Sequence, residues 1–155
     1  MSAPLDFEKA FKKFALVDVM AAAKKGLARA GINVMNDAIQ QVPKVPIDEG
    51  TLRGSGSVFV DNMLVATSED LGQAAGTPAK SLGGSMAKRV NDLEAVIGFN
   101  TPYAKYLHEH PEFNFTEPGT GGKYLETKMA TNKDAYMKTI VTTMRKELAK
   151  VTPTI

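Results

Sequence analysis

The last part of the chain carries an apolar stripe that a long helix would align on one face. The stripe consists of Leu125, Met129, Tyr136, Ile140, Met144, Leu148 and Val151. These residues recur at helical spacing across about seven turns, and Pro153 then ends the pattern. The sequence therefore predicts a long C-terminal helix that packs this face against the rest of the domain.

A second helical pattern occupies the N-terminal part of the chain. Its stripe consists of Val17, Met20, Leu27, Met35, Ile39 and Val42. The spacing predicts a helix that starts near Asp18 and is stopped by Pro43. Gly26 and Gly31 are expected to weaken this helix, each by about 1 kcal/mol relative to alanine.

Other apolar residues complete the helical prediction. Phe7, Phe11 and Phe14 predict a short amphipathic helix over residues 6–15, with Asp6 as its N-cap. The methionines at helical spacing are expected to fill the core, because the flexible thioether adapts to irregular gaps. These are Met35, Met129 and Met144.

Between the long helices the pattern changes to strands. Residues 58–60 and 63–66 predict a β-hairpin around Asp61-Asn62, a pair that tolerates positive φ. A third strand is predicted at 93–99, where Gly98 suggests a bulge or a close backbone approach.

Residues 101–109 predict a short helix with Thr101 as N-cap and Pro102 in its first turn. The resulting fold class is α+β: a small antiparallel sheet packed against a long N-terminal and a long C-terminal helix, with extended loops. Residues 1–155 are expected to form a single domain of ordinary size.

Composition narrows the possible functions. The chain is 43% hydrophobic and 23% charged, which is typical of a globular protein, and its net charge of +2 does not require a nucleic acid as the main ligand. The absence of cysteine excludes disulfides, thiol catalysis and thiolate metal sites. The N-terminus lacks the pattern of a signal peptide, and no apolar stretch approaches the length of a membrane span, so we expect a soluble protein.

Two segments are expected to be extended loops that contact neighbouring subunits. Residues 69–90 are rich in small side chains, and ordering about twenty residues costs at least ~20 kcal/mol of backbone entropy. Such a loop needs cover from outside, as does the loop over 110–122. The candidate contact residues are Leu71, Thr77, Leu82 and Met86 in the first loop and Phe113 and Phe115 in the second.

The segment EPGTGGKYLE, residues 117–126, only superficially resembles a phosphate-binding loop. Glu117 stands where that motif requires glycine, and Tyr124 stands where it requires serine or threonine after Lys123. We interpret Gly121 and Gly122 as a turn into the last helix.

The sequence HEHPE, residues 108–112, is the one metal-like cluster. His108, His110 and Glu112 could in principle serve a metal-dependent hydrolase, but catalytic zinc normally takes three protein ligands. We favour polar residues at a helix end, where His108 suits the helix dipole. No catalytic residue, metal ligand or cofactor is predicted.

The C-terminal helix is basic. Residues 123–150 carry seven Lys or Arg against three acidic residues, a net charge of +4. The simpler interpretation is a solvated face, and the alternative is contact with the phosphates of a polyanion such as DNA.

Three segments in a fixed order resemble a known family. They are QVPKVPIDEGTLRGSGSV (41–58), VIGFNTPYAKYLHE (96–109) and GGKYLETKM (121–129). In order and spacing they resemble the tailed-bacteriophage neck and tail-completion proteins of the HK97 gp10-like family. The matching positions are Pro46, Asp48, Gly50, Leu52, Arg53, Tyr103, Ala104, Tyr106, Glu109, Tyr124 and Leu125, with Glu49 where the family usually has threonine.

These matching positions, together with Gly122, are interpreted as scaffold residues that shape a corner. Asp48 can bond to backbone amides two residues on, Gly50 can adopt positive φ, and Leu52 then turns inward. Arg53 is predicted to pair with Glu109 beneath the short helix.

The resemblance implies a non-enzymatic structural protein of the virion. Such a protein would be a tail-completion or head–tail joining component, a hexameric or dodecameric ring between adjacent neck and tail proteins. DNA would pass through its lumen without sequence-specific binding. Assembly would take place in the host cytoplasm, with no membrane involved. The alternative within the same particle is a head-side adaptor or minor capsid protein.

Overall fold

The computed structural model of the chain describes residues 14–46, 51–73, 93–101, 103–115 and 117–151. In chain order the elements are α2 (Leu16–Gln40), α3 (Thr51–Gly54), β1 (Gly56–Val60), β2 (Met63–Thr67), the 3₁₀ helix η1 (Ser68–Leu71), β3 (Ala95–Phe99), α4 (Ala104–Glu109) and α5 (Tyr124–Leu148). The predicted α+β class is confirmed, with both long helices and the three-stranded antiparallel sheet present. The helix predicted over 6–15 falls almost entirely outside the described residues.

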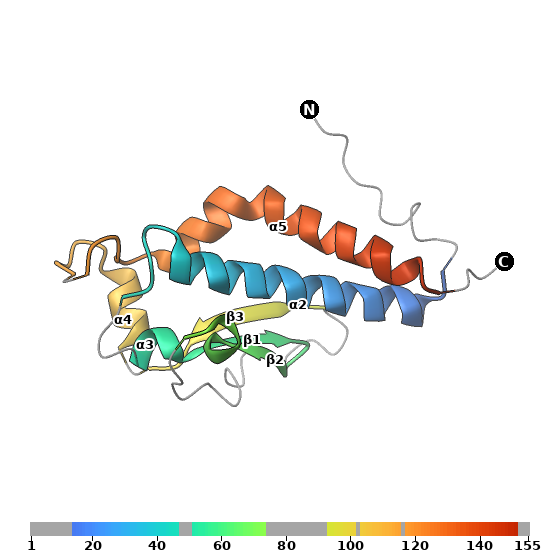
Figure 1. Ribbon diagram of the computed structural model, residues 1–155, viewed down its shortest axis with the longest axis horizontal. Helices are drawn as coiled ribbons and strands as arrows, with labels where there is room; N and C mark the ends of the chain where they lie inside the picture. Colours follow the sequence, from blue (N-terminus) through green and yellow to red (C-terminus); the bar gives the residue numbers. More distant parts are fainter. Residues whose placement is uncertain (1–13, 47–50, 74–92, 102, 116, 152–155) are drawn as a thin grey trace.

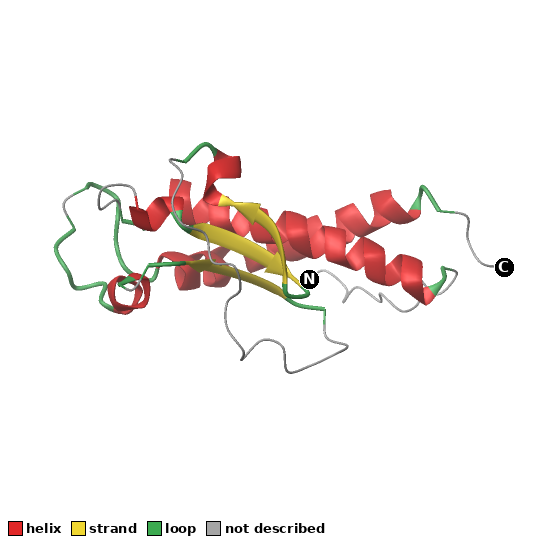
Figure 2. Cartoon of the chain, turned by 90° about the horizontal axis from the view of Figure 1, so that it is seen from below, coloured by secondary structure: helices red, strands yellow, loops and turns green. Residues whose placement is uncertain are grey.

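The long helices and the sheet form three layers (Figure 1). α2 is the middle layer, with α5 along one side and the sheet along the other. Seen from the sheet side, the strands lie over the two long helices and run obliquely along them (Figure 2). α2 therefore has to bury two faces at once, and this requirement determines which residues it can carry.

Small residues allow α2 to fill the middle layer. A Cβ atom at Gly26 would lie 2.9 Å from the carbonyl oxygen of Ile140 in α5, and one at Gly31 would lie 2.6 Å from a methyl of Val58 in β1. The two glycines therefore mark the closest approaches of the layers. The expectation that they only weaken the helix missed this role.

The apolar stripe predicted for α2 is only partly its buried face. Met35 and Ile39 are buried, whereas Val17 and Val42 are exposed. The remaining buried positions of α2 are mostly small residues, namely Ala22, Gly26, Ala30, Gly31, Val34 and Ala38. A pattern of large apolar residues therefore identifies only a few of the α2 residues that are buried in these interfaces.

The sheet has the order β2-β1-β3, with both pairs antiparallel. The predicted hairpin turn is confirmed, since Asp61 and Asn62 have φ values of 50° and 64°. The bulge suggested for Gly98 is wrong: Gly98 pairs with Ser57 in a continuous register. The register shift lies instead between β1 and β2, next to Val58.

Two details of the helices also differ from the prediction. The N-cap of α4 is Tyr103 rather than Thr101, whose buried hydroxyl has no hydrogen-bond partner among the described residues. In α5, Met144 is buried as expected, but Met129 is 49% exposed and does not fill the core.

The packing of α2 gives a direct test. Gly26→Leu should lower the free energy of unfolding by about 2 kcal/mol or more, because the new side chain meets the backbone of α5. Urea denaturation of this variant is compared with that of Ala21→Leu, which lies on an exposed position of the same helix. Equal stability of the two variants would contradict the close approach.

Candidate functional site

The three segments that carry the family resemblance meet in one apolar cluster. Leu52 and Tyr124 are fully buried there, together with Ala38, Val45 and Ala104. Tyr103 and Leu125 are partly buried against the same cluster. The Tyr124 hydroxyl donates a hydrogen bond to the carbonyl oxygen of Ala104 at 3.1 Å. Leu52 is buried, as predicted, and the scaffold role of these residues stays a prediction.

Arg53 is held differently from the prediction. Its guanidinium donates two hydrogen bonds to the carbonyl oxygen of Val45 and forms an ion pair with Glu117 at 3.0 Å. The predicted partner, Glu109, is engaged elsewhere, so that prediction is wrong. Arg53 thereby ties the segment before α3 to the segment before α5.

Glu109 connects the end of α4 to the start of α5. Its carboxylate lies 2.6 Å from the Lys123 ammonium and 2.9 Å from Nδ1 of His108. The bond from Lys123, followed by that from His108, lowers the pKa of Glu109 from 4.5 to about 2. The Lys123 ammonium also contacts Glu126 at 2.9 Å, so two carboxylates already neutralise it.

The glycine-rich segment is a turn, though not at the predicted glycines. Positive φ occurs at Gly119 (81°) and at Lys123 (55°). Gly122 is required for a different reason, because a Cβ atom there would lie 2.8 Å from the backbone of Pro111. Gly122, one of the two glycines interpreted as the turn, is therefore needed for close packing and not for a positive φ.

The segment 110–122 has more internal support than predicted. Backbone hydrogen bonds join Lys44 to Gly119 and to Gly121, and Glu117 pairs with Arg53. Phe113 and Phe115 are both half-buried. The described part of this segment is thus supported from within the chain, and its contact with a neighbouring subunit stays a prediction.

The two histidines have separate partners. His108 lies edge-on to Tyr124, and its Nε2 accepts a long hydrogen bond from the Leu125 amide. His110 bonds to Glu112 at 2.7 Å and stacks on Phe113. Within the described ranges no three His, Asp or Glu side chains converge as a metal site would need.

The other predicted residues fall into three groups. Pro46 is buried, and Leu71 packs against the core beside β1 rather than standing free. Tyr106 is 58% exposed and contacts His110 and Phe113. Asp48, Gly50, Thr77, Leu82 and Met86 lie outside the described residues.

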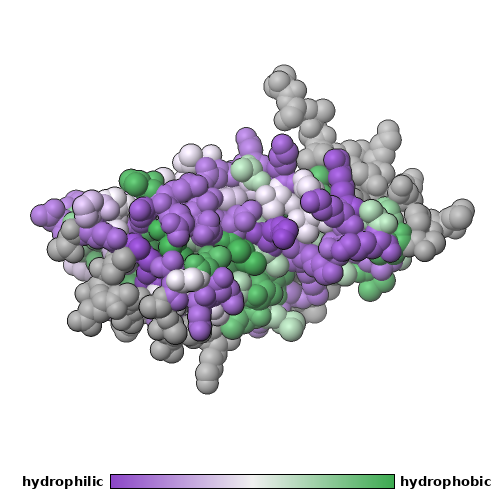
Figure 3. Space-filling model, in the orientation of Figure 1, coloured by the Kyte–Doolittle hydropathy of each residue, from purple (hydrophilic) through white to green (hydrophobic). Residues whose placement is uncertain are grey.

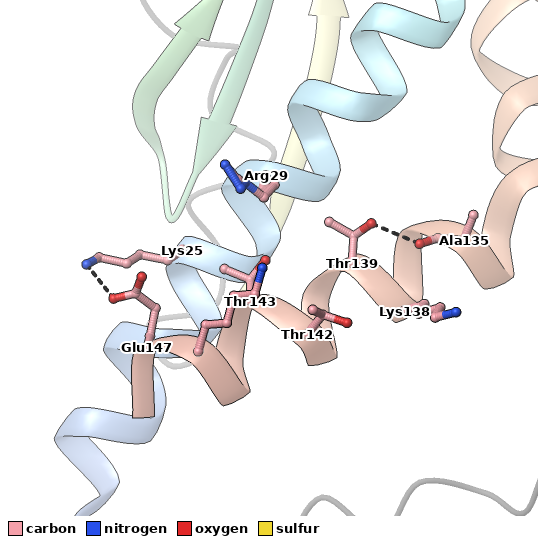
Figure 4. Close-up of a pocket in the computed structure, with 9 residues that line it drawn as sticks. Lys25, Arg29, Ala135, Lys138, Thr139, Thr142, Thr143 and Glu147 are labelled. Carbon is pink, nitrogen blue, oxygen red and sulfur yellow. Dashed lines mark hydrogen bonds and ion pairs between the residues drawn. The ribbon is translucent and has the colours of Figure 1, made fainter. Parts of the chain in front are cut away.

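A basic groove lies between the two long helices (Figure 4). It has a volume of about 540 Å³, and its lining residues are Lys25, Arg29, Ala135, Lys138, Thr139, Thr142, Thr143, Lys146 and Glu147. Four of these side chains are cationic, and one of them, Lys25, pairs with Glu147 at 2.8 Å. The lining carries a net charge of +3, the sum of four cations and one carboxylate.

Only half of this groove is predictable from the sequence pattern. The positive charge of α5 was noted, but the contribution of Lys25 and Arg29 from α2 depends on helix packing. One of the counted lysines, Lys128, is instead buried and donates to the carbonyl oxygen of Pro43 at 2.8 Å. Burial lowers the pKa of Lys128, against the opposing effect of Asp37.

The second surface feature is strand β2. Met63, Leu64 and Val65 are 71%, 46% and 42% exposed, and they are consecutive, so both faces of the strand present apolar side chains. Among the described residues β2 pairs only with β1, which leaves its outer edge without a partner strand there. In the space-filling view, green side chains gather over the sheet while α5 is mainly purple (Figure 3).

Comparison with models of known families, with curated proteins and with solved structures finds no match for this chain. In the described part of the chain, no helix has the length and apolar character needed to cross a bilayer.

The partner of Arg53 can be tested with double-mutant cycles. We expect a coupling energy of about 0.5–1 kcal/mol between Arg53→Ala and Glu117→Ala, because the Glu117 side chain is 37% exposed and solvent screens the pair. The parallel cycle with Glu109→Ala should give no coupling. Coupling to Glu109 instead would restore the sequence-based pairing.

The low pKa of Glu109 predicts a pH dependence. A carboxylate whose folded pKa is depressed stabilises the fold above its unfolded pKa, and this contribution disappears as pH falls from about 4.5 toward about 2. Glu109→Gln should therefore melt below the wild type at pH 7, and the gap should close in that acidic window. Asp134→Asn, at an exposed position, is the control, and an unchanged gap at low pH would contradict the assignment.

Proposed function

We propose that this protein is a structural, non-enzymatic subunit that self-associates into a ring at the neck of a tailed-bacteriophage virion, as a tail-completion or head–tail joining component. The observation that carries the proposal is the exposed apolar strand β2. The ordered trio of family-like segments supports the same class, because Leu52, Ala104 and Tyr124, one from each segment, pack in a single buried apolar cluster.

An unpaired apolar edge is a liability for a protein that acts alone. Edge strands of monomeric proteins are usually short, charged or covered, since an exposed edge pairs readily with another chain. Residues 63–67 contain no charged side chain, and three of the five are large, apolar and exposed. A surface of this kind is typical of one that is buried against a partner.

A neighbouring copy is the partner that a ring requires. In a ring each subunit contacts the next head-to-tail, so the surface that receives β2 differs from β2 itself. Ring closure would bury every copy of this edge, which explains why a soluble chain can carry it. The adjacent neck and tail proteins would then contact the two faces of the ring.

The edge strand can be tested by adding charge. The double variant Leu64→Lys/Val65→Lys should abolish self-association, because burying two ammonium groups at an apolar contact is costly. Light scattering reports the mass, and negative-stain images of the wild type should show rings. The matched control is Met129→Lys/Met137→Lys, which adds the same charge at exposed methionines of α5.

The outcomes separate clearly. The control variant should assemble like the wild type, and circular dichroism should show that both double variants are folded. A wild type that stays monomeric at every concentration, or an edge-strand variant that assembles normally, would overturn the proposal. Images of the phage neck with the labelled protein would distinguish a tail-side component from a head-side adaptor.

A further inference from the structure

We infer that the groove between α2 and α5 binds the phosphate backbone of double-stranded nucleic acid, without reading its sequence. The inference rests on the groove alone and does not require the ring. Its four cations come from both helices, Lys25 and Arg29 from α2 and Lys138 and Lys146 from α5 (Figure 4). The site therefore exists only in the folded domain.

Most of the cations in the groove lack a compensating charge. Lys25 pairs with Glu147, but Arg29, Lys138 and Lys146 form no ion pair with any described residue. Three uncompensated positive charges around one groove repel one another in the folded state. An anion bound between them would relieve that repulsion, and the released counterions would add to the affinity.

The neutral lining also suits phosphate. Thr142 and Thr143 make no side-chain hydrogen bond to the described residues, so both hydroxyls can donate to phosphate oxygens. Thr139, in contrast, is already engaged, since it donates to the carbonyl oxygen of Ala135 and accepts from Asn33. The groove thus combines cationic side chains with hydroxyls that are unpaired among the described residues, the usual set of groups that contact a nucleic-acid backbone.

The shape of the groove favours an extended polyanion over a single small anion. Lys138 and Lys146 are eight residues apart on one helix, a separation of about 12 Å along its axis. One strand of a duplex presents a phosphate about every 3.4 Å of its axis, so this length spans about three phosphates. A lone phosphate ion could contact only part of the charged lining.

The lining residues argue against two other ligands. Among the nine there is no aromatic side chain on which the bases of a single strand could stack. The one purely apolar residue is Ala135, so an amphipathic protein helix would find no pocket for large apolar anchors. A duplex, which presents a dense charge and needs neither contact, remains the best fit.

The test measures binding of a fluorescently labelled 20-base-pair DNA duplex by anisotropy. With about three phosphates contacted per subunit, the plot of log K against log salt should have a slope of about −2.7. Affinity should accordingly fall about 40-fold between 50 and 200 mM salt. A second duplex of unrelated sequence should bind with the same affinity.

Two double variants with equal charge changes locate the site. Arg29→Glu/Lys138→Glu should weaken binding at least 10-fold and reduce the salt slope by about 2. Lys105→Glu/Lys133→Glu, at exposed positions outside the groove, should keep most of the affinity and the wild-type slope. Arg29→Ala/Lys138→Ala provides a milder version, and circular dichroism checks that each variant is folded.

Several results would overturn the inference. One is an equal loss of DNA affinity in the groove variant and the control variant. Another is that single-stranded DNA binds as tightly as the duplex or more tightly. A third is that inorganic phosphate binds in the groove while the duplex does not bind. The edge-strand variant Leu64→Lys/Val65→Lys keeps the two proposals distinct. If this edge-strand variant forms no rings but its groove still binds DNA, the slope of log K against log salt for each subunit should equal that of the wild type.

Discussion

The close packing of α2 between α5 and the sheet is the constraint on which the rest of the structure depends. Both faces of this helix must approach a neighbouring layer, and the backbone of Ile140 and the side chain of Val58 leave no room for a side chain at Gly26 or Gly31. Glycine costs a helix about 1 kcal/mol of propensity, which is small beside the packing of a whole helix face. The same packing of α2 against α5 brings Arg29 and the cations of α5 into the lining of one groove.

A second set of contacts fixes the end of the molecule where the helices meet α3 and α4. Arg53 bonds to the Val45 carbonyl and to Glu117, while Glu109 holds Lys123 at the start of α5. The Arg53–Glu117 pair joins residues that are 64 positions apart in the sequence, and Tyr124 is buried at the same end of the molecule. Among the family-like residues, Leu52, Ala104 and Tyr124 have a structural explanation, because they pack in one buried cluster at this end of the molecule.

Local sequence patterns predicted the helices and strands of this fold. The features that these patterns did not predict depend on packing between residues that are distant in the sequence. Hydrophobic spacing located both long helices, and Asp61-Asn62 located the hairpin, because each signal lies within a few residues. The partner of Arg53 was wrong because two carboxylates lie at comparable places in the sequence and only the fold selects one. Half of the groove was missed for the same reason, since charges on separate helices show no joint periodicity. Met129 was placed in the core because spacing alone does not say how wide the buried face is.

The two candidate surfaces lie on different layers, and this separation has a functional consequence. Strand β2 belongs to the sheet, whereas the groove lies between α2 and α5, so α2 stands between them (Figure 1). A subunit can therefore associate through its sheet edge while the groove stays open to a ligand. In the proposed ring, each subunit would repeat the proposed phosphate contact, so groove affinities that are low for one subunit would add up along a duplex. Contacts of this kind depend on charge and not on base sequence, so they would keep DNA bound to the ring and still allow it to slide along its axis.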